Sequence, residues 1–445
     1  MASPAATVTE YCGLIAKSRL LSEAEVATRQ ALWLAEGSDA DPDGFRRNLV
    51  AAKALTAYQA ALVQRGHTEG FFVGGYTVLD RVGKGQSAGV YKALHPSGQL
   101  VAVKVLPPSK VRDPLALARF LREGRLLTLL EHPHVVRAFQ VAREGSVAFI
   151  AMEYLDGETL DEVLARRKRL PAPEAVRVVS QALAGLQHLH EKRVVHRDLK
   201  PANLMLTPAG QATALTATLK ILDIGVGRES QVLGAGEAEL TGEGTILGTP
   251  DYLAPEQARD PRDADVRSDL YSLGCVLFHL IAGRPPHRGR TVMASIVEHA
   301  TATPTALAAL APDIPPGLQE VFDKLTAKSP ADRYATPADA EFALKPFLPC
   351  DGTDDAPTSD MLPSYKAWLA AEGPPPTDPL LDLPPVAVRP SAKPAPGEVE
   401  VELYEPPGAR RLTDLDRRDF TMLAAGGAAV ALAGAVGYAL AKLFR

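Results

Sequence analysis

The period of hydrophobic and polar positions sets the first part of the chain apart from the rest. Residues 1–70 carry a helical period and no run rich in Val and Ile. Ser22 and Glu25 form a capping box at the start of one helix, and residues 45–64 have the pattern of another amphipathic helix. The apolar stripe expected on the first helix consists of Ala24, Ala27, Ala31, Leu32 and Leu34. The pattern predicts a small helical module over residues 1–70, with packing against its neighbour as its simplest role.

After Tyr76 the apolar positions alternate, as they do in strands. Three strands with polar turns between them are predicted for the following part of the chain, over residues 76–82, 89–95 and 99–106. A helix over 120–130 and two further strands over 135–142 and 146–153 come next, and helical patterns dominate beyond Thr159. The pattern predicts a strand-rich lobe followed by a larger helical lobe, together spanning residues 76–347.

Composition adds a linker and excludes several classes of protein. Residues 349–409 hold about 14 of the prolines, which predicts an extended, disordered linker. Of the 445 residues, 46% are hydrophobic and 23% are charged, values that argue against a wholly disordered chain. The formal charge of −5 supplies no basic field for nucleic acid, so no nucleic-acid partner is expected. The three cysteines lie far apart, which argues against a zinc site or a disulfide framework.

An apolar segment near the C-terminus has the length of a membrane span. Residues 420–441 contain no charge and as a helix would extend about 33 Å. Arginines are more frequent before the segment than after it, which predicts a single-pass protein of the cell membrane with its main domain in the cytoplasm. Small residues at every fourth position, from Gly427 to Ala439, would allow helices to pair in a homodimer. The alternative is a buried or loosely ordered alanine-rich helix.

Candidate chemistry begins in the strand-rich lobe. Residues 83–90 read Gly-Lys-Gly-Gln-Ser-Ala-Gly-Val and join two strands, where glycines allow the backbone to approach phosphate groups. Lys104 follows in an apolar strand, at an interval that suggests a cation for α- and β-phosphates. Glu123 shares its helix face with Leu126 and Leu127, so it is expected to point inward and to pair with Lys104. Taken singly, the loop could be an ordinary hairpin, Lys104 an edge residue and Glu123 a solvated charge.

At residues 196–203, which read His-Arg-Asp-Leu-Lys-Pro-Ala-Asn, the chain resembles the catalytic loop of the protein kinase superfamily, in particular the bacterial eukaryotic-like Ser/Thr kinases. The resemblance implies an α+β, bilobal protein kinase fold over residues 76–347 that uses ATP and Mg²⁺. It further implies that Asp198 accepts the proton of the substrate hydroxyl and that Lys200 neutralises charge on the transferred phosphoryl group. Asn203 and Asp223 would hold magnesium, with Asp223-Ile224-Gly225 in place of the usual Asp-Phe-Gly.

The same resemblance assigns the nucleotide site. It implies that the nucleotide is bound by Val82, Gly83, Lys84, Gly85, Val90, Ala102, Lys104, Glu123, Glu153, Leu155 and Met205. Of these, Glu153 and Leu155 would bind adenine through their backbone groups, next to Met152 at the gatekeeper position. Val90, Ala102 and Met205 would be the apolar plates on either side of the ring.

Further motifs concern structure and regulation. Glu256 in the Ala-Pro-Glu motif is expected to pair with Arg333, and Asp269 to anchor the catalytic loop. The activation segment, residues 223–256, offers Thr241 and Thr245, either of which we predict to be autophosphorylated and clamped by Arg197. Thr249 would contact the acceptor site, which favours Ser/Thr protein substrates.

The sequence thus predicts a membrane-tethered Ser/Thr protein kinase. Two alternatives stay open. One is a pseudokinase or membrane scaffold that binds nucleotide without transferring phosphate. The other is a kinase of small molecules on the same fold.

Overall fold

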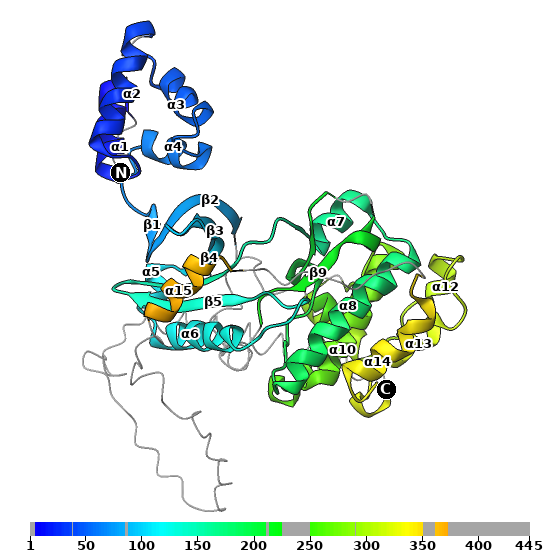
Figure 1. Ribbon diagram of the computed structural model, residues 1–445. Coiled ribbons are helices and arrows are strands. Elements are labelled where there is room, and N and C mark those ends of the chain that lie inside the picture. Colours follow the sequence, from blue (N-terminus) through cyan, green and yellow to red (C-terminus); the bar gives the residue numbers. More distant parts are fainter. Residues whose placement is uncertain are drawn as a thin grey trace, which may run out of the picture. The chain divides into compact units, whose positions relative to one another are not determined.

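A computed structural model describes residues 5–37, 39–84, 88–210, 213–224, 250–289, 291–349 and 361–372 (Figure 1). Within this described part, no helix is both long enough and apolar enough to cross a membrane. The predicted membrane helix, residues 420–441, lies outside it, as do Gly85 and the threonines of the activation segment.

The N-terminal module contains four helices around its own core. They are α1 (Val8–Ser18), α2 (Glu23–Glu36), α3 (Pro42–Ala51) and α4 (Ala57–Gln64). The capping box of Ser22 and Glu25 is present as predicted. The single helix predicted over residues 45–64 is wrong, because Lys53 has a left-handed backbone (φ 53°) and Thr56 caps a new helix.

The predicted apolar stripe of α2 is also wrong. Leu32 and Leu34 are 69% and 41% exposed. The helix instead turns Val26 and Trp33 toward the module core, where the Trp33 ring lies 5.8 Å from that of Phe45. Alanine and leucine occur on both sides of this helix, so the pattern alone could not identify the buried side.

The strand-rich lobe is built on an antiparallel sheet in the order β1-β2-β3-β4-β6-β5 (Figure 1). Its strands are β1 (Phe72–Val73), β2 (Tyr76–Lys84), β3 (Gly89–Leu94), β4 (Leu100–Leu106), β5 (Ala138–Glu144) and β6 (Val147–Glu153). On β4, Ala102 and Leu106 belong to the main core, whereas Val101 and Val103 belong to a separate cluster on the opposite face. Because neighbouring side chains of a strand point to opposite faces, Lys104 faces the same side as Ala102.

Helices α5 (Pro108–Val111) and α6 (Pro114–Thr128) follow β4, and α6 packs on the sheet. Gly124 makes this close approach feasible. A Cβ atom there would lie only 2.7 Å from Cγ2 of Val141 and 2.9 Å from Cγ1 of Ile150. The glycine therefore sets how near α6, and with it Glu123, can come to the sheet.

The second lobe is mainly helical. Its helices are α7 (Leu160–Arg167), α8 (Ala172–Glu191), α9 (Pro255–Arg259), α10 (Val266–Ala282), α11 (Val292–Thr301), α12 (Leu307–Leu310), α13 (Leu318–Leu325) and α14 (Pro337–Leu344). A small antiparallel sheet in the order β7-β8-β9 lies beside them, formed by β7 (Glu158–Thr159), β8 (Leu204–Thr207) and β9 (Thr218–Ile221). Helices α8 and α10 pack against each other, and most of both is buried. The two predicted lobes are thus confirmed.

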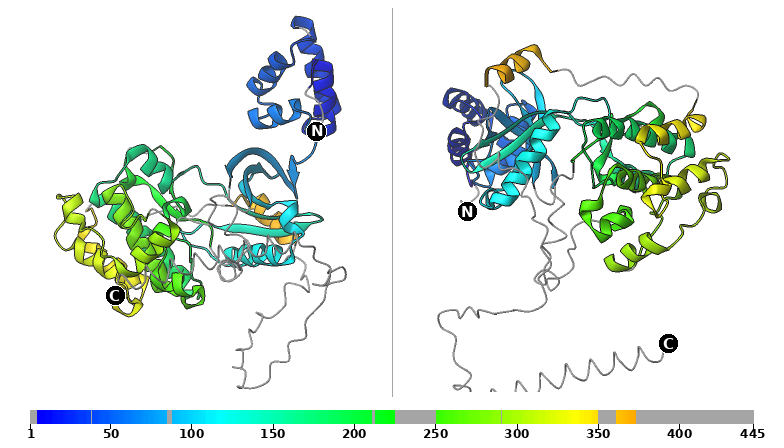
Figure 2. Two further views of the ribbon diagram at one scale, coloured as in Figure 1. Left: turned by 180° about the vertical axis from the view of Figure 1, so that it is seen from behind. Right: turned by 90° about the horizontal axis from the view of Figure 1, so that it is seen from below.

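The chain returns to the first lobe in α15 (Pro363–Glu372), which corrects the prediction of a disordered linker for these residues. Figures 1 and 2 show α15 against the sheet. Tyr365 is fully buried in the cluster that contains Val101 and Val103, with Trp368 packed beside it. The backbone N–H of Leu362 donates to Oε1 of Gln99 at 2.8 Å. Burial of the Tyr365 ring and partial burial of Trp368 on this sheet face stabilise a helix in a segment whose prolines predict an extended chain.

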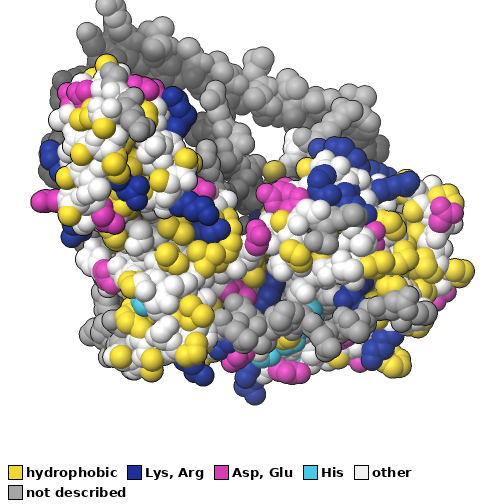
Figure 3. Space-filling view, turned by 45° about the horizontal axis from the view of Figure 1, so that its top comes forward, with side chains coloured by type: hydrophobic (Ala, Val, Ile, Leu, Met, Phe, Trp, Pro, Cys, Tyr) yellow, Lys and Arg dark blue, Asp and Glu magenta, His cyan; other side chains and the backbone are white. Residues whose placement is uncertain are grey.

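On the face drawn in Figure 3, charged side chains of both signs are scattered among hydrophobic and other side chains, and lysines and arginines gather on part of the helical lobe. The basic run of residues 166–169 at the end of α7 is partly neutralised. Arg166 pairs with Glu158 and Arg167 with Glu174, each at 2.7 Å.

Candidate active site

Lys104 lies at the centre of a three-residue charge cluster between the lobes. Its Nζ donates to Oε1 of Glu123 at 2.7 Å and to Oδ1 of Asp223 at 2.8 Å. Strand β4 supplies the lysine, α6 the glutamate, and the segment after β9 the aspartate. The predicted pair of Lys104 and Glu123 is confirmed, and Asp223 joins it.

Electrostatics favour the charged forms of Lys104 and Asp223, whereas burial raises the pKa of Glu123. Burial by itself would lower the pKa of Lys104, but the carboxylates of Asp223 and Glu123 outweigh it and hold that pKa above its usual value. Burial would also raise the pKa of Asp223, yet the charge of Lys104 holds it below its usual value. An ammonium group and an ionised carboxylate therefore face the space in which the sequence predicts phosphates and metal.

The catalytic loop brings together the three residues predicted to act on the phosphoryl group. Nζ of Lys200 donates to Oδ2 of Asp198 at 3.0 Å. Nδ2 of Asn203 donates to the backbone oxygen of Asp198 at 2.8 Å and to its Oδ2 at 3.1 Å. The carboxylate of Asp198 is therefore held in one orientation by an ammonium and an amide group. A carboxylate positioned in this way can accept a proton from an approaching hydroxyl.

Asp269 on α10 binds the backbone of the catalytic loop. Its two carboxylate oxygens accept the N–H groups of His196 and Arg197, each at 2.8 Å. Arg197 has a left-handed backbone, with φ of 67°. Two backbone N–H groups that donate to one buried carboxylate stabilise this unfavourable conformation. The anchoring role predicted for Asp269 is confirmed.

His196 ties the loop to the residue before Asp223. Its Nε2 lies 2.8 Å from the backbone oxygen of Leu222, and its Nδ1 accepts the N–H of Asp198 at 3.3 Å. Since Nδ1 accepts, the ring proton is assigned to Nε2, which then donates to Leu222. The N–H of Leu222 in turn donates to the backbone oxygen of Asn203 at 2.9 Å. Asp198, Asn203 and Asp223 are thus positioned by one hydrogen-bonded backbone unit.

The segment between the lobes contains a pair that sequence reasoning missed. Glu153 accepts a hydrogen bond from Nζ of Lys220 at 2.8 Å, and both side chains are buried. Glu153 also accepts the N–H of Arg137 at 2.8 Å and donates its own N–H to the Arg137 oxygen at 2.9 Å. The sequence feature that could have revealed this pair is Lys220, a lysine between Leu219 and Ile221 in a short apolar strand.

The described residues predicted to line the nucleotide site lie on strands β2, β3, β4, β6 and β8, on helix α6 and in the segment after β6. Gly83 pairs with Val90 across the hairpin, and Val90 pairs with Lys104. Ala102 is buried opposite Met152, and Val82 remains 49% exposed. Leu155 packs against the main core, and Met205 lies on β8 opposite Lys220. Lys84 ends strand β2, and its side chain lies outside the described part of the chain.

The donor set of the site fits a hard divalent cation. Asp223 offers a carboxylate next to Asn203, and hard cations such as Mg²⁺ prefer oxygen ligands. Because Nδ2 of Asn203 donates to Asp198, the amide oxygen of Asn203 faces away from Asp198. The residues present therefore match the magnesium ligands that the sequence predicts.

Glu256 and Arg333 form a buried ion pair beneath the site, as predicted. The two guanidinium nitrogens of Arg333 donate to the two oxygens of Glu256 at 2.6 Å and 2.9 Å. Ser268 adds a third donor at 2.6 Å. Burial alone would raise the pKa of Glu256, but the hydrogen bonds from Arg333 and Ser268 hold it below its usual value. The segment that follows residues 225–249 is thereby fixed to α10.

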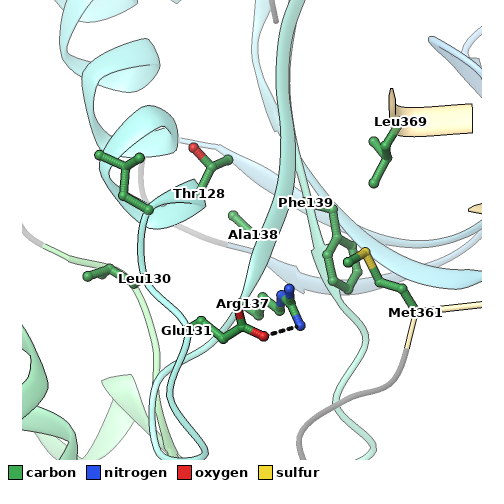
Figure 4. A pocket seen from close by; sticks show the side chains of 9 residues that line it. Thr128, Leu130, Glu131, Arg137, Ala138, Phe139, Met361 and Leu369 are labelled. Atoms are coloured by element: carbon green, nitrogen blue, oxygen red, sulfur yellow. Dashed lines mark ion pairs between the residues drawn. The ribbon is translucent and has the colours of Figure 1, made fainter. Parts of the chain in front are cut away.

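A separate cavity of about 180 Å³ lies away from these residues, between the end of α6, the start of β5 and α15 (Figure 4). Glu131 and Arg137 line it and pair at 2.8 Å. Met361 and Leu369 complete the wall from the α15 side. The cavity is thus a consequence of α15 packing on the first lobe.

Comparison with known proteins gives the class of the domain. The protein kinase domain family matches residues 76–344. The chain therefore belongs to the protein kinase family.

Several similar proteins are serine/threonine-protein kinases of bacteria. A probable serine/threonine-protein kinase of Streptomyces coelicolor is 36% identical over 267 residues, which are 59% of this chain and 38% of that protein. PrkC of Bacillus subtilis is 32% identical over 279 residues, covering 62% of this chain and 41% of that protein. The crystal structure of the Mycobacterium tuberculosis PknI kinase domain aligns with a TM-score of 0.48 and 28% identity, covering 62% of this chain and 98% of that chain. The chain thus spans about two fifths of the length of these curated relatives.

Proposed function

We propose that this protein is an ATP- and Mg²⁺-dependent serine/threonine protein kinase. The observation that carries the proposal is the position of Lys104, which bridges Glu123 and Asp223 at 2.7 Å and 2.8 Å. In a kinase this arrangement joins the helix, the phosphate-binding lysine and the metal-binding aspartate into one working site. A scaffold that only binds nucleotide has no need of it.

The catalytic loop supports the transfer step. The oxygen of a substrate hydroxyl bonds to the γ-phosphorus of ATP while the bond from that phosphorus to the bridging oxygen breaks and ADP leaves. The hydroxyl proton passes to the carboxylate of Asp198, which Lys200 and Asn203 hold in place. Asn203 and Asp223 would hold Mg²⁺, which would supply positive charge to the phosphate oxygens.

The preference for Ser/Thr in proteins rests on the sequence and on the relatives. Lys200 stands two residues after Asp198, as in Ser/Thr kinases, and the relatives named above are serine/threonine-protein kinases. Thr249 and a regulatory phosphate on Thr241 or Thr245 belong to this proposal, and all three lie outside the described residues.

Localisation is a further part of the proposal. Residues 420–441 form an uncharged segment of membrane-spanning length, with more arginines before it than after it. We therefore expect the kinase domain to face the cytoplasm from a single-pass anchor, with a homodimer formed through the small residues of that helix.

The first experiment uses the full chain in detergent with labelled ATP and Mg²⁺, and compares the wild type with Asp198→Asn. Phosphate on the protein or on a generic substrate is expected for the wild type, and a loss of at least about 100-fold for the variant. Asp313→Asn, an exposed position of the helical lobe, is the matched control. Nucleotide binding without any transfer by the wild type would favour the scaffold instead.

A further inference from the structure

The strand that leads into the nucleotide-binding hairpin is irregular. Strand β2 pairs with β3, but the register shifts between Val78 and Asp80, so Leu79 falls outside the regular ladder. A bulge of this kind leaves backbone groups without their usual strand partner and bends the strand. Gly83, at the predicted phosphate loop, follows Leu79 by four positions.

The N-terminal module supplies donors to the backbone at this irregularity. Oγ1 of Thr56 donates to the backbone oxygen of Leu79 at 2.5 Å. Nε2 of Gln59 donates to the backbone oxygen of Val78 at 2.7 Å, and the Gln59 side chain is 4% exposed. Two neighbouring carbonyls of β2 are therefore held by two side chains of one helix end.

The same two side chains form the capping box of α4. Oε1 of Gln59 accepts the N–H of Thr56 at 2.9 Å, and Oγ1 of Thr56 accepts the N–H of Gln59 at 3.1 Å. Each side chain thus uses an acceptor atom for the helix and a donor for the strand. Because the capping bonds fix both rotamers, the donors are aimed at β2 before any nucleotide arrives.

Helix α4 is itself held by the module core. Ala60 and Val63 are fully buried, and the hydroxyl of Tyr11 on α1 donates to the backbone oxygen of Ala60 at 2.8 Å. A displacement of the module core would therefore move the end of α4, and with it the two donors on β2.

We infer that Thr56 and Gln59 are positioning residues for the nucleotide-binding hairpin, and that the N-terminal module acts on the kinase domain through them. The inference rests on the proposed function, since it assigns the hairpin to nucleotide. Neither residue touches the nucleotide; both set the path of β2 toward Val82 and Gly83. The N-terminal module then influences the position of the nucleotide-binding hairpin in addition to packing against the kinase domain.

Two substitutions test this while keeping the helix cap. Gln59→Glu retains the acceptor for Thr56 and loses the donor to Val78, and Thr56→Asp retains an N-cap acceptor and loses the donor to Leu79. In the full chain, we expect the Kd for Mg²⁺ with a non-hydrolysable ATP analogue to rise about three- to tenfold in each. Amide hydrogen exchange in residues 76–94 should become faster.

The control variants separate positioning from a general loss of stability. Ser22→Ala removes the equivalent capping side chain of α2, which makes no described contact with β2. Thr56→Ser keeps both functions of the hydroxyl. Both should behave as the wild type in analogue affinity and in exchange over residues 76–94. Thr56→Val removes both the donor to Leu79 and the cap acceptor without adding charge. It covers the case in which a carboxylate beside β2 unfolds the hairpin, and Ser22→Ala shows what the loss of a cap alone does.

The inference is wrong if Gln59→Glu and Thr56→Val leave affinity and exchange unchanged, or if Ser22→Ala changes them equally. A wild type that binds the analogue but transfers no phosphate would overturn the proposed function alone. Should the wild type bind no nucleotide, hydrogen exchange over residues 76–94 would still decide whether these side chains hold the hairpin.

Discussion

The phenolic oxygens of Tyr76 and Tyr365 lie 2.8 Å apart, although the two residues are separated by 289 positions in the chain. Tyr76 belongs to β2 and Tyr365 to α15, and both are fully buried. The family match ends at residue 344, yet the apolar face of the first lobe is completed only by a helix beyond it. The folded unit of this kinase therefore extends to α15.

Substitution of Tyr365 tests this extension. Tyr365→Ala removes a fully buried ring and should lower the free energy of unfolding by about 3–5 kcal/mol, measured by chemical denaturation. Tyr365→Phe keeps the ring and should cost only about 1 kcal/mol for the lost hydrogen bond. Phe342→Ala, at a position of α14 that is 71% exposed, is the control. An equal effect of Phe342→Ala and Tyr365→Ala would show that α15 does not contribute to the fold.

Gly124 offers a test of the distance between α6 and the sheet. A methyl group there collides with Val141 and Ile150, so Gly124→Ala should push α6 outward and separate Glu123 from Lys104. We expect kcat/KM for ATP to fall by about 10- to 100-fold. Gly13→Ala on α1 adds the same methyl group with no neighbour within 4 Å and should leave activity unchanged. Full activity of Gly124→Ala would contradict the role given to this contact.

The buried pair of Glu256 and Arg333 should be sensitive to removal of one partner. Arg333→Met leaves a buried carboxylate without its counterion and should destabilise the protein by about 3–5 kcal/mol in chemical denaturation. The double variant with Glu256→Gln should recover part of that loss, because no unpaired charge remains. Arg262→Met breaks an exposed pair with Asp260 and serves as control, with no measurable change expected. A double variant no more stable than the single one would argue against this account.

The free energy of unfolding at acidic pH should depend on two buried histidines in the helical lobe. Burial, together with the charge of Lys328, lowers the pKa of His287 to about 4, and burial, His287 and Lys328 lower that of His299 to about 3. An unfolded histidine titrates near 6.5, so below that pH the unfolded chain binds protons that the folded chain does not. The free energy of unfolding should therefore fall as pH decreases from 6.5 to about 5.

Replacing His287 measures how much of this pH dependence of the unfolding free energy comes from that residue. His287→Gln should reduce the slope of unfolding free energy against pH by up to about 1.4 kcal/mol per pH unit. His67→Gln, on the exposed surface of the module, is the matched control. An unchanged slope in His287→Gln would mean that this residue is protonated in the folded protein.

Much of the active site could be predicted from the sequence because its chemistry is carried by residue type within short motifs. Asp198, Lys200 and Asn203 lie within six positions, and a local loop suffices to bring them together. Lys104 and Glu123 were also predictable, since a strand and a helix each expose a definite face. The same holds for the two lobes, whose elements follow the change from a strand period to a helical one.

Other features are decided by packing between distant segments, and no local pattern reports them. The ion pair between Lys104 and Asp223 joins residues that are 119 positions apart in the chain. The buried ion pair between Lys220 and Glu153 joins strands of two different sheets. Helix α15 is surrounded by prolines, so its local preference is for an extended chain, and only the bare sheet face around Tyr76 stabilises it as a helix. Likewise, Thr56 and Gln59 fall inside the single helix that the sequence predicts over residues 45–64, and the structure shows that they form a capping box. The sequence alone thus determined which residues are predicted to perform the chemistry. The tertiary structure decided which surfaces are buried, because burial depends on the partner that folding brings opposite each face.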